Sequence, residues 1–176
     1  MRDVTAEVVE LLASMESLPW MGEPVSQLEH SLQAGSIARS AGADTELVLA
    51  AVLHDIGRAQ GLWIKGDPHE LAGERWCRER FSERLAYLVG SHVAAKRVLV
   101  ASEPDYDVQL TATSTATLRS QGGPASAEEV TQFLTHPWAK DAIALRRADE
   151  SAKRPGGASL SLDEVASLVI ALGVPT

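Results

Sequence analysis

Histidine and aspartate side chains that could bind metal recur beside the apolar helical segments of this chain. The adjacent pair His54 and Asp55 ends the most apolar segment, residues 45–56. A buried Asp costs folding free energy unless it is paired or bound to a metal. Because adjacent helical residues point about 100° apart, His54 could bind one ion while Asp55 bridges to a second. A single pair of this kind is more often a helix end that merely carries polar residues.

Three more histidines, and an aspartate near the C-terminal end of the chain, favour the interpretation as a metal site. A lone His beside an apolar helix face is more often a packed core residue than a ligand, but four of them with two aspartates are harder to explain by packing. Four imidazoles and two carboxylates suit iron, manganese or zinc better than calcium, which prefers oxygen ligands. His136 is expected in a loop and is left out. The predicted ligands are His30, His54, Asp55, His69, His92 and Asp149.

Two cations and two hydroxyls are spaced so that they could converge beside these ligands. Lys96 lies four residues after one predicted ligand, Arg146 lies three residues before another, and Ser114 and Thr117 are three apart. Residues three or four apart share a helix face. Arg offers a bidentate fork, Lys a point charge and hydroxyls further donors, so this set suits an oxyanion or a phosphonate. Each residue taken alone would be read as solvated surface.

The elements that must position these residues are helices separated by short breaks. Apolar residues recur at helical spacing, Gly and Pro mark the breaks, and a capping-box pattern begins at Ser126. Few residues are aromatic, while Ala, Leu and Val carry the apolar content, which favours helices over a β-sandwich. We expect an all-α fold with one domain over 1–176, and helices near 4–15, 25–41, 45–56, 68–80, 82–100, 107–119, 126 onward, 138–152 and 161–173.

Length and charge narrow the classes of function. A chain of 176 residues can bury a substantial core without disulfide bonds or structural metal ions. Its formal net charge of -8 and the lack of a basic stretch argue against nucleic acid and favour a small-molecule partner. No segment resembles a signal peptide or reaches the length of a membrane span. A single cysteine, Cys77, excludes an intramolecular disulfide, so a cytoplasmic location is expected.

The chain from about residue 25 to 153 resembles the HD superfamily. More narrowly, it resembles the HD-domain mixed-valent diiron oxygenases that cleave the carbon–phosphorus bond of small α-hydroxyphosphonates. The resemblance begins in VSQLEHSLQAGSIARSAGADTELVLAAVLHDIGR and continues through HELAGERW, SHVAAKR, TATSTATLRSQGGP and ALRRADESAK. An HD pair alone would be common, but these motifs in this order are specific.

The resemblance implies a role for each candidate residue. One iron would be held by His30, His54, Asp55 and Asp149, and the other by His69, His92 and the bridging Asp55. The metals would be a mixed-valent Fe(II)/Fe(III) pair, although such ligands accept other divalent metals. The substrates would be a 1-hydroxyphosphonate and O2, and the products phosphate and a carboxylic acid. Phosphonate binding would fall to Lys96, Ser114, Thr117 and Arg146, with Asp55, Glu23 and Lys96 also acting in catalysis.

Two positions depart from the pattern of that family. Related enzymes carry a Tyr and a Glu three residues apart before the QLEH helix, where this chain has Trp20 and Glu23. Trp has no oxygen for a metal, so Trp20 is expected either to pack or to contact a cationic substrate tail. Glu23 is expected to contact the iron or a substrate ammonium. Arg58 stands where relatives often have His, and either adds charge for a more anionic ligand or points to solvent.

Two other functions compete with the oxygenase. A metal-dependent HD phosphohydrolase would use the same ions to activate water for attack on a phosphate ester or nucleotide. The complete ligand set and the anion clamp favour the oxygenase, and few aromatics are present to stack on a base. A non-catalytic binding domain is the third alternative, against which the intact ligand set argues. The oligomeric state and the tail of the substrate cannot be read from the residues.

Overall fold

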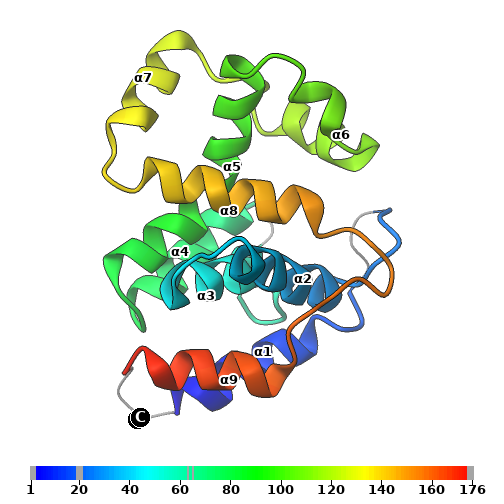
Figure 1. Cartoon of the computed structure of the whole chain (residues 1–176), viewed down its shortest axis with the longest axis vertical. Coiled ribbons are helices and arrows are strands. Elements are labelled where there is room, and N and C mark those ends of the chain that lie inside the picture. Colours follow the sequence, from blue (N-terminus) through cyan, green and yellow to red (C-terminus); the bar gives the residue numbers. More distant parts are fainter. Residues whose placement is uncertain (1–2, 19–21, 63, 65, 174–176) are drawn as a thin grey trace.

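Helices form all the regular structure of the computed structural model, which describes residues 3–18, 22–62, 64 and 66–173 (Figure 1). Within these residues there is no β-strand, so the predicted all-α class is confirmed. The elements are α1 (Val4–Ser14), α2 (Gln27–Ser40), α3 (Thr45–Leu53), the 3₁₀ turn η1 (Ile56–Arg58), α4 (His69–Arg78), α5 (Glu83–Ser102), the 3₁₀ turn η2 (Asp107–Gln109), α6 (Ala112–Ser120), α7 (Ala127–Thr135), α8 (Ala139–Ser151) and α9 (Leu162–Ala171).

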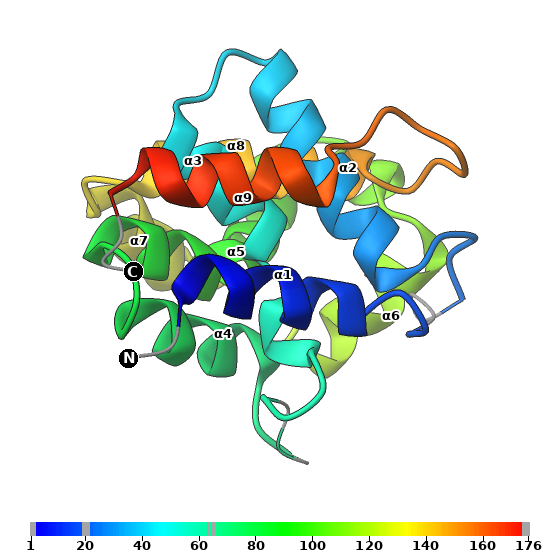
Figure 2. The ribbon, with the colours of Figure 1, turned by 90° about the horizontal axis from the view of Figure 1, so that it is seen from below.

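The long helix α5 organises the middle of the bundle. It packs against α3, α4, α7 and α8, while α2 packs against α3 and α8. Figure 1 shows α6 and α7 at one end of the molecule and α1 and α9 at the other. Seen from below, α1 and α9 lie in front of the central helices (Figure 2). One cluster of buried apolar side chains extends from Val8 to Val169.

Helix α3 is the most deeply buried element. Every residue from Leu47 to Leu53 is buried, and burial of large apolar side chains contributes roughly 1.5–3 kcal/mol each. The Asp44 carboxylate caps its start by accepting a hydrogen bond from the backbone N–H of Leu47 at 2.8 Å. The helix ends three residues earlier than predicted, because His54 is its C-cap and the chain then turns into η1.

Glycine at position 57 lets the segment after α3 touch the start of α4. A Cβ placed on Gly57 would lie 2.0 Å from the carbonyl oxygen of His69 and 2.7 Å from the backbone nitrogen of Gly73. Any other residue would therefore force the two segments apart. This close approach sets Asp55, two residues upstream, against the first residue of α4.

Other predicted boundaries differ from the structure in small ways. The segment predicted as one helix over 107–119 is divided into η2 and α6, with Thr111 capping α6 through the backbone N–H of Ser114. The capping box expected at Ser126 is present, with Glu129 as its reciprocal partner. In the described part of the chain, no helix combines the length and apolarity needed to cross a membrane.

Candidate metal centre and anion cavity

Two groups of three side chains gather atoms that could bind metal. His30, His54 and Asp149 form the inner group, and Asp55, His69 and His92 form the outer group. Within each group the potential ligand atoms lie within 4.8 Å of one another, and all six residues are buried. The structure therefore brings together all the residues predicted as ligands, although their role as ligands stays a prediction.

Asp55 lies between the two groups. Its Oδ1 is 2.9 Å from Nε2 of His69 and 3.7 Å from Nε2 of His92. Its Oδ2 is 3.7 Å from Nε2 of His54 in the inner group, and has no hydrogen-bond partner although it is buried. An unpaired buried carboxylate oxygen is costly, and a metal ion at this point would satisfy it. The position of Asp55 therefore suits a bridging ligand.

Each of the four histidines is oriented by its second ring nitrogen. Nδ1 of His30 donates to the carbonyl of Ala152 at 2.7 Å, Nδ1 of His54 to the carbonyl three residues before it at 2.7 Å, and Nδ1 of His92 likewise at 2.7 Å. Nδ1 of His69 lies 3.1 Å from the carboxylate of Glu70. Such bonds fix the tautomer and direct the Nε2 lone pair to a metal.

The four Nε2 atoms face one another in pairs. Nε2 of His30 is 3.1 Å from Nε2 of His54, and the same distance separates the Nε2 atoms of His69 and His92. Because each Nδ1 carries the ring proton, facing Nε2 atoms present two lone pairs to each other, which a cation between them would relieve. The donor set of nitrogen and carboxylate oxygen suits iron, manganese or zinc.

The electrostatic environment keeps both aspartates ionised. Burial by itself would raise the pKa of Asp55, but the Arg58 guanidinium and the neighbouring histidines outweigh it and hold that pKa well below its usual range. The pKa of Asp149 is likewise raised by burial but held well below its usual range, chiefly by Arg146. Ionised carboxylates are the form that binds metal.

The environment shifts the pKa values of the buried histidines in different directions. Burial lowers the pKa of His54 and of His92, the latter well below its usual value, so both rings are held neutral. Burial also acts to lower the pKa of His30, but the hydrogen bond and charge of Asp149 raise it overall. Neutral imidazole is the form that coordinates a metal.

A small cavity of about 20 Å³ adjoins the outer group, roughly enough for one water molecule. All three residues of the outer group line it, whereas Asp149 is the only residue of the inner group that does so. The four residues predicted to form an anion clamp also line it. Its full lining is Asp55, Arg58, His69, His92, Val93, Lys96, Ser114, Thr117, Gln121, Arg146 and Asp149.

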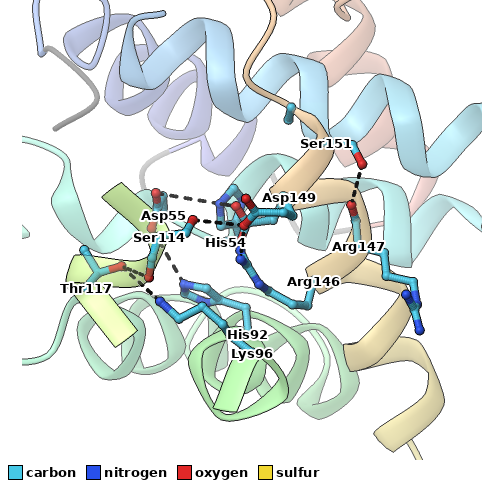
Figure 3. A network of polar contacts seen from close by, with 12 residues as sticks. His54, Asp55, His92, Lys96, Ser114, Thr117, Arg146, Arg147, Asp149 and Ser151 are labelled. Carbon is cyan, nitrogen blue, oxygen red and sulfur yellow. Dashed lines mark hydrogen bonds and ion pairs between the residues drawn. The ribbon is translucent and has the colours of Figure 1, made fainter. Parts of the chain in front are cut away.

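Three helices contribute the clamp residues. Lys96 on α5 donates to Oγ1 of Thr117 on α6 at 3.0 Å, and the two side chains face each other beside His92 (Figure 3). Arg146 on α8 donates to the carboxylates of Asp149 and Glu150. Burial, followed by the charge of Arg146, lowers the pKa of Lys96 to about 8.

The local partner of Asp55 was missed in the sequence. Arg58, three residues on, donates from Nε to Oδ1 of Asp55 at 3.1 Å, and its Nη2 lies 3.1 Å from Nε2 of His69. The sequence indicated no local partner for Asp55 and allowed Arg58 to point to solvent; the structure corrects both points. The i,i+3 spacing was the available signal, but the helix was expected to end at Ile56, whereas the structure has a 3₁₀ turn over Ile56–Arg58.

Glu150 and Lys153 are further site residues that the sequence reasoning missed. Oε2 of Glu150 accepts from the hydroxyl of Ser114 at 2.9 Å and from Arg146. Nζ of Lys153 lies 2.7 Å from the Ser114 hydroxyl and 2.8 Å from Oε1 of Glu150. Both residues belong to the quoted motif ALRRADESAK, and their three-residue spacing could have indicated an ion pair.

One predicted residue is not brought to the cavity, and another lies outside the described residues. Glu23 accepts a hydrogen bond from Oγ1 of Thr111 at 2.5 Å and is not among the described residues that line the cavity. Trp20 lies outside the described residues, so its predicted packing or cation–π role stays a prediction. His136, which was left out of the ligand set, lies after α7 and stacks on Tyr87 with ring centroids 3.6 Å apart.

Comparison with known proteins places this chain among phosphonate-cleaving relatives. Residues 28–114 match the HD domain. The chain is 40% identical over 142 residues to a [1-hydroxy-2-(trimethylamino)ethyl]phosphonate dioxygenase (glycine-betaine-forming) of Leisingera caerulea, covering 77% of this chain and 72% of the relative. It is 34% identical to a hydroxymethylphosphonate dioxygenase of Gimesia maris, covering 76% and 71%.

A third relative has no assigned activity. It is the uncharacterized protein L432 of Acanthamoeba polyphaga mimivirus, 32% identical over 174 residues that cover 93% of this chain and 78% of the relative. The identities to the two dioxygenases cover more than two thirds of each chain. The expected family is therefore confirmed: this chain belongs to the HD-domain family, in the group that contains these hydroxyphosphonate dioxygenases.

Proposed function

We propose that this protein is an HD-domain diiron oxygenase that uses O2 to cleave the carbon–phosphorus bond of a small 1-hydroxyphosphonate. The products are phosphate and a carboxylic acid. Its two dioxygenase relatives are named for substrates of this kind. The single observation that carries the proposal is the arrangement of two potential metal groups around Asp55, directly beside a cavity lined by cations and hydroxyls.

The residues fit two metal ions. His30, His54, Asp149 and Asp55 would hold the first ion, and His69, His92 and the bridging Asp55 the second. Support comes from the unpaired Oδ2 of Asp55 and from the paired Nε2 atoms that face one another. A mixed-valent Fe(II)/Fe(III) pair would supply the redox chemistry by which O2 oxidises the hydroxyl-bearing carbon.

The residues of the chain itself bind and orient the substrate. Lys96 and Arg146 provide positive charge for the phosphonate, and Ser114 and Thr117 provide hydroxyl donors. Because the cavity is small and Lys96 and Arg146 are buried, a bound anion would be shielded from bulk water, and electrostatic attraction is stronger in such a place than in water. Asp55 stays ionised beside Arg58 and keeps the two metal groups linked.

The competing phosphohydrolase is less well supported. A phosphohydrolase that acts on a nucleotide would need aromatic side chains on which the base can stack. Among the described residues that line the cavity and the adjoining groove, none is Trp, Tyr or Phe. A small phosphate ester would still fit the same anion clamp, so the experiment must separate oxygen-dependent from hydrolytic release of phosphate.

The test starts from protein purified without oxygen and partially oxidised. We expect about two irons per chain, as the paired groups imply, and an EPR signal of Fe(II)/Fe(III) that changes when a 1-hydroxyphosphonate is added. Phosphate release and O2 consumption should then proceed in equal amounts. Asp55→Asn is the matched control, since it keeps the size of the side chain while removing the shared charge.

Other outcomes would reject the proposal. Phosphate release that continues without O2, or that occurs only from phosphate esters, would indicate a phosphohydrolase. One metal per chain, with no spectral response to the phosphonate, would indicate that the two groups do not act together.

A further inference from the structure

Arg58 lies between the cavity and a larger outer groove. Its side chain is 21% exposed, its Nε lies 3.1 Å from Oδ1 of Asp55, and its Nη2 lies 3.1 Å from Nε2 of His69. It lines both the cavity and the adjoining groove of about 670 Å³. A substrate whose phosphonate lies among Lys96 and Arg146 would therefore have its tail near the Arg58 guanidinium.

The described cavity lining offers no acid that is available to an ammonium group. Its cations are Arg58, Lys96 and Arg146, and its only acids are Asp55 and Asp149, which the proposed function assigns to the metal ions. Glu23, the sequence candidate for contact with an ammonium, accepts its hydrogen bond from Thr111 and does not line the cavity. The charge of the cavity therefore favours anions at both ends of a short substrate.

The charges of the outer groove are already paired. Asp67 accepts from Arg75 at 2.8 Å, Glu70 lies 3.1 Å from Nδ1 of His69, and Arg97 forms two bonds to Glu129 on α7. A charged tail that enters the groove would have to compete with these partners. Of the arginines that line the groove, Arg58 also lines the cavity. If Asp55 were bound to a metal ion, the carboxylate charge opposite Arg58 would be shared with that ion.

We propose that Arg58 selects a substrate with a second anionic group, so that the protein acts on a 1-hydroxyphosphonate whose short tail ends in a carboxylate. This inference rests on the proposed function. It predicts a tail of opposite charge to the trimethylamino group in the name of one relative. Arg is well suited to this role because its planar fork binds a carboxylate with two parallel hydrogen bonds.

The reaction for such a substrate is balanced by O2 alone. R–CH(OH)–PO3H2 and O2 give R–COOH and H3PO4. The carbon–phosphorus, carbon–hydrogen and O–O bonds break, and new bonds to oxygen form on carbon and on phosphorus. The hydrogen from carbon leaves as a proton that ends on the product acids, and O2 accepts four electrons. With a carboxylate tail the organic product is a dicarboxylic acid, which carries one more negative charge than the product from an uncharged tail.

The inference is tested with three 1-hydroxyphosphonates of equal length, ending in a carboxylate, a methyl or an ammonium group. Their affinities are measured by calorimetry on protein loaded with Zn²⁺, which cannot support oxidation, and their turnover is measured separately on the iron-loaded protein. We expect the carboxylate to bind about tenfold or more tightly than the methyl compound, and the ammonium compound to bind most weakly.

Three variants assign the effect to Arg58. Arg58→Gln should remove most of the preference for the carboxylate, while Arg58→Lys should keep part of it. Zinc content is measured first in each, because Arg58 contacts two predicted ligands. Arg119→Gln is the control: it changes the net charge equally at an exposed position on α6 that lines neither the cavity nor the groove.

The outcomes separate this inference from the proposed function. Tighter binding of the ammonium compound, or an unchanged ranking in Arg58→Gln, overturns the role of Arg58 even if phosphonates are cleaved. If the carboxylate preference is present on the zinc protein and is lost in Arg58→Gln, the inference holds. If no 1-hydroxyphosphonate then releases phosphate with O2, the oxygenase assignment fails instead.

Discussion

The inner and outer groups use the same residue types but differ in access. His30 and His54 of the inner group are almost wholly buried and do not line the cavity, whereas every residue of the outer group does. The inner group is held by α2, the end of α3 and α8, which pack against one another. The outer group comes from the turn after α3, the first turn of α4 and the middle of α5.

This difference indicates that the two groups have different roles. Only Asp149 of the inner group borders the cavity, so the residues of this group can hold an ion and also connect the helices. The outer group shares a surface with Lys96, Thr117 and Arg58, so an ion there would be next to a bound anion. Asp55 is the single carboxylate that faces both groups.

The largest effect should come from Asp55, which borders both groups. Asp55→Asn removes the shared charge, and we expect metal content and kcat/KM to fall by more than the roughly 10–100-fold effect of changing a residue that only orients a ligand. Metal analysis and turnover are measured on the same preparation. Asp163→Asn, which removes an exposed acid on α9 that lines neither the cavity nor the groove, should leave both unchanged. Full metal content in Asp55→Asn would show that the groups are independent.

The inner group should matter more than the outer group for stability without metal. His30 is fully buried and bonds the carbonyl of Ala152, 122 residues away. His30→Ala leaves that carbonyl unpaired beside a void and should cost about 2–4 kcal/mol. His69→Ala at the start of α4 should cost about 1 kcal/mol. Urea unfolding with a chelator measures both, and equal losses would remove the structural distinction between the groups.

The smallest expected effect is the change of kcat/KM with pH that Lys96 causes. Burial lowers the pKa of Lys96 to about 8, so Lys96 is cationic below that pH and neutral above it. We expect kcat/KM for a phosphonate to fall as pH rises through 8, by up to about tenfold per unit, while metal content stays constant. Lys96→Arg should move this loss to higher pH. A profile unchanged by Lys96→Arg would assign the titration to another group.

The sequence was most informative where the signal is local. The helical spacing of apolar residues and the Ser126 capping box predicted elements that the structure contains, because such patterns depend on nearest neighbours along one helix. The ligand candidates could also be chosen, since buried His and Asp beside apolar faces require a partner. The end of α3 was predicted three residues too late because Ile56 is a buried apolar residue close to the helix end but belongs to the following 3₁₀ turn.

Residue types and motifs alone determined the helical class, the six candidate ligands and the membership of a phosphonate-related family. The family resemblance already implied which ligand joins which group, and the tertiary structure supplied the contacts within each group, because those contacts depend on helices brought together from distant parts of the chain. Only the tertiary structure decided that Arg58 faces Asp55 and that Glu23 lies with Thr111 instead. The physical reason is that a side chain's partner is set by the packing of α3, α4 and α5, which Gly57 permits and which no single segment encodes.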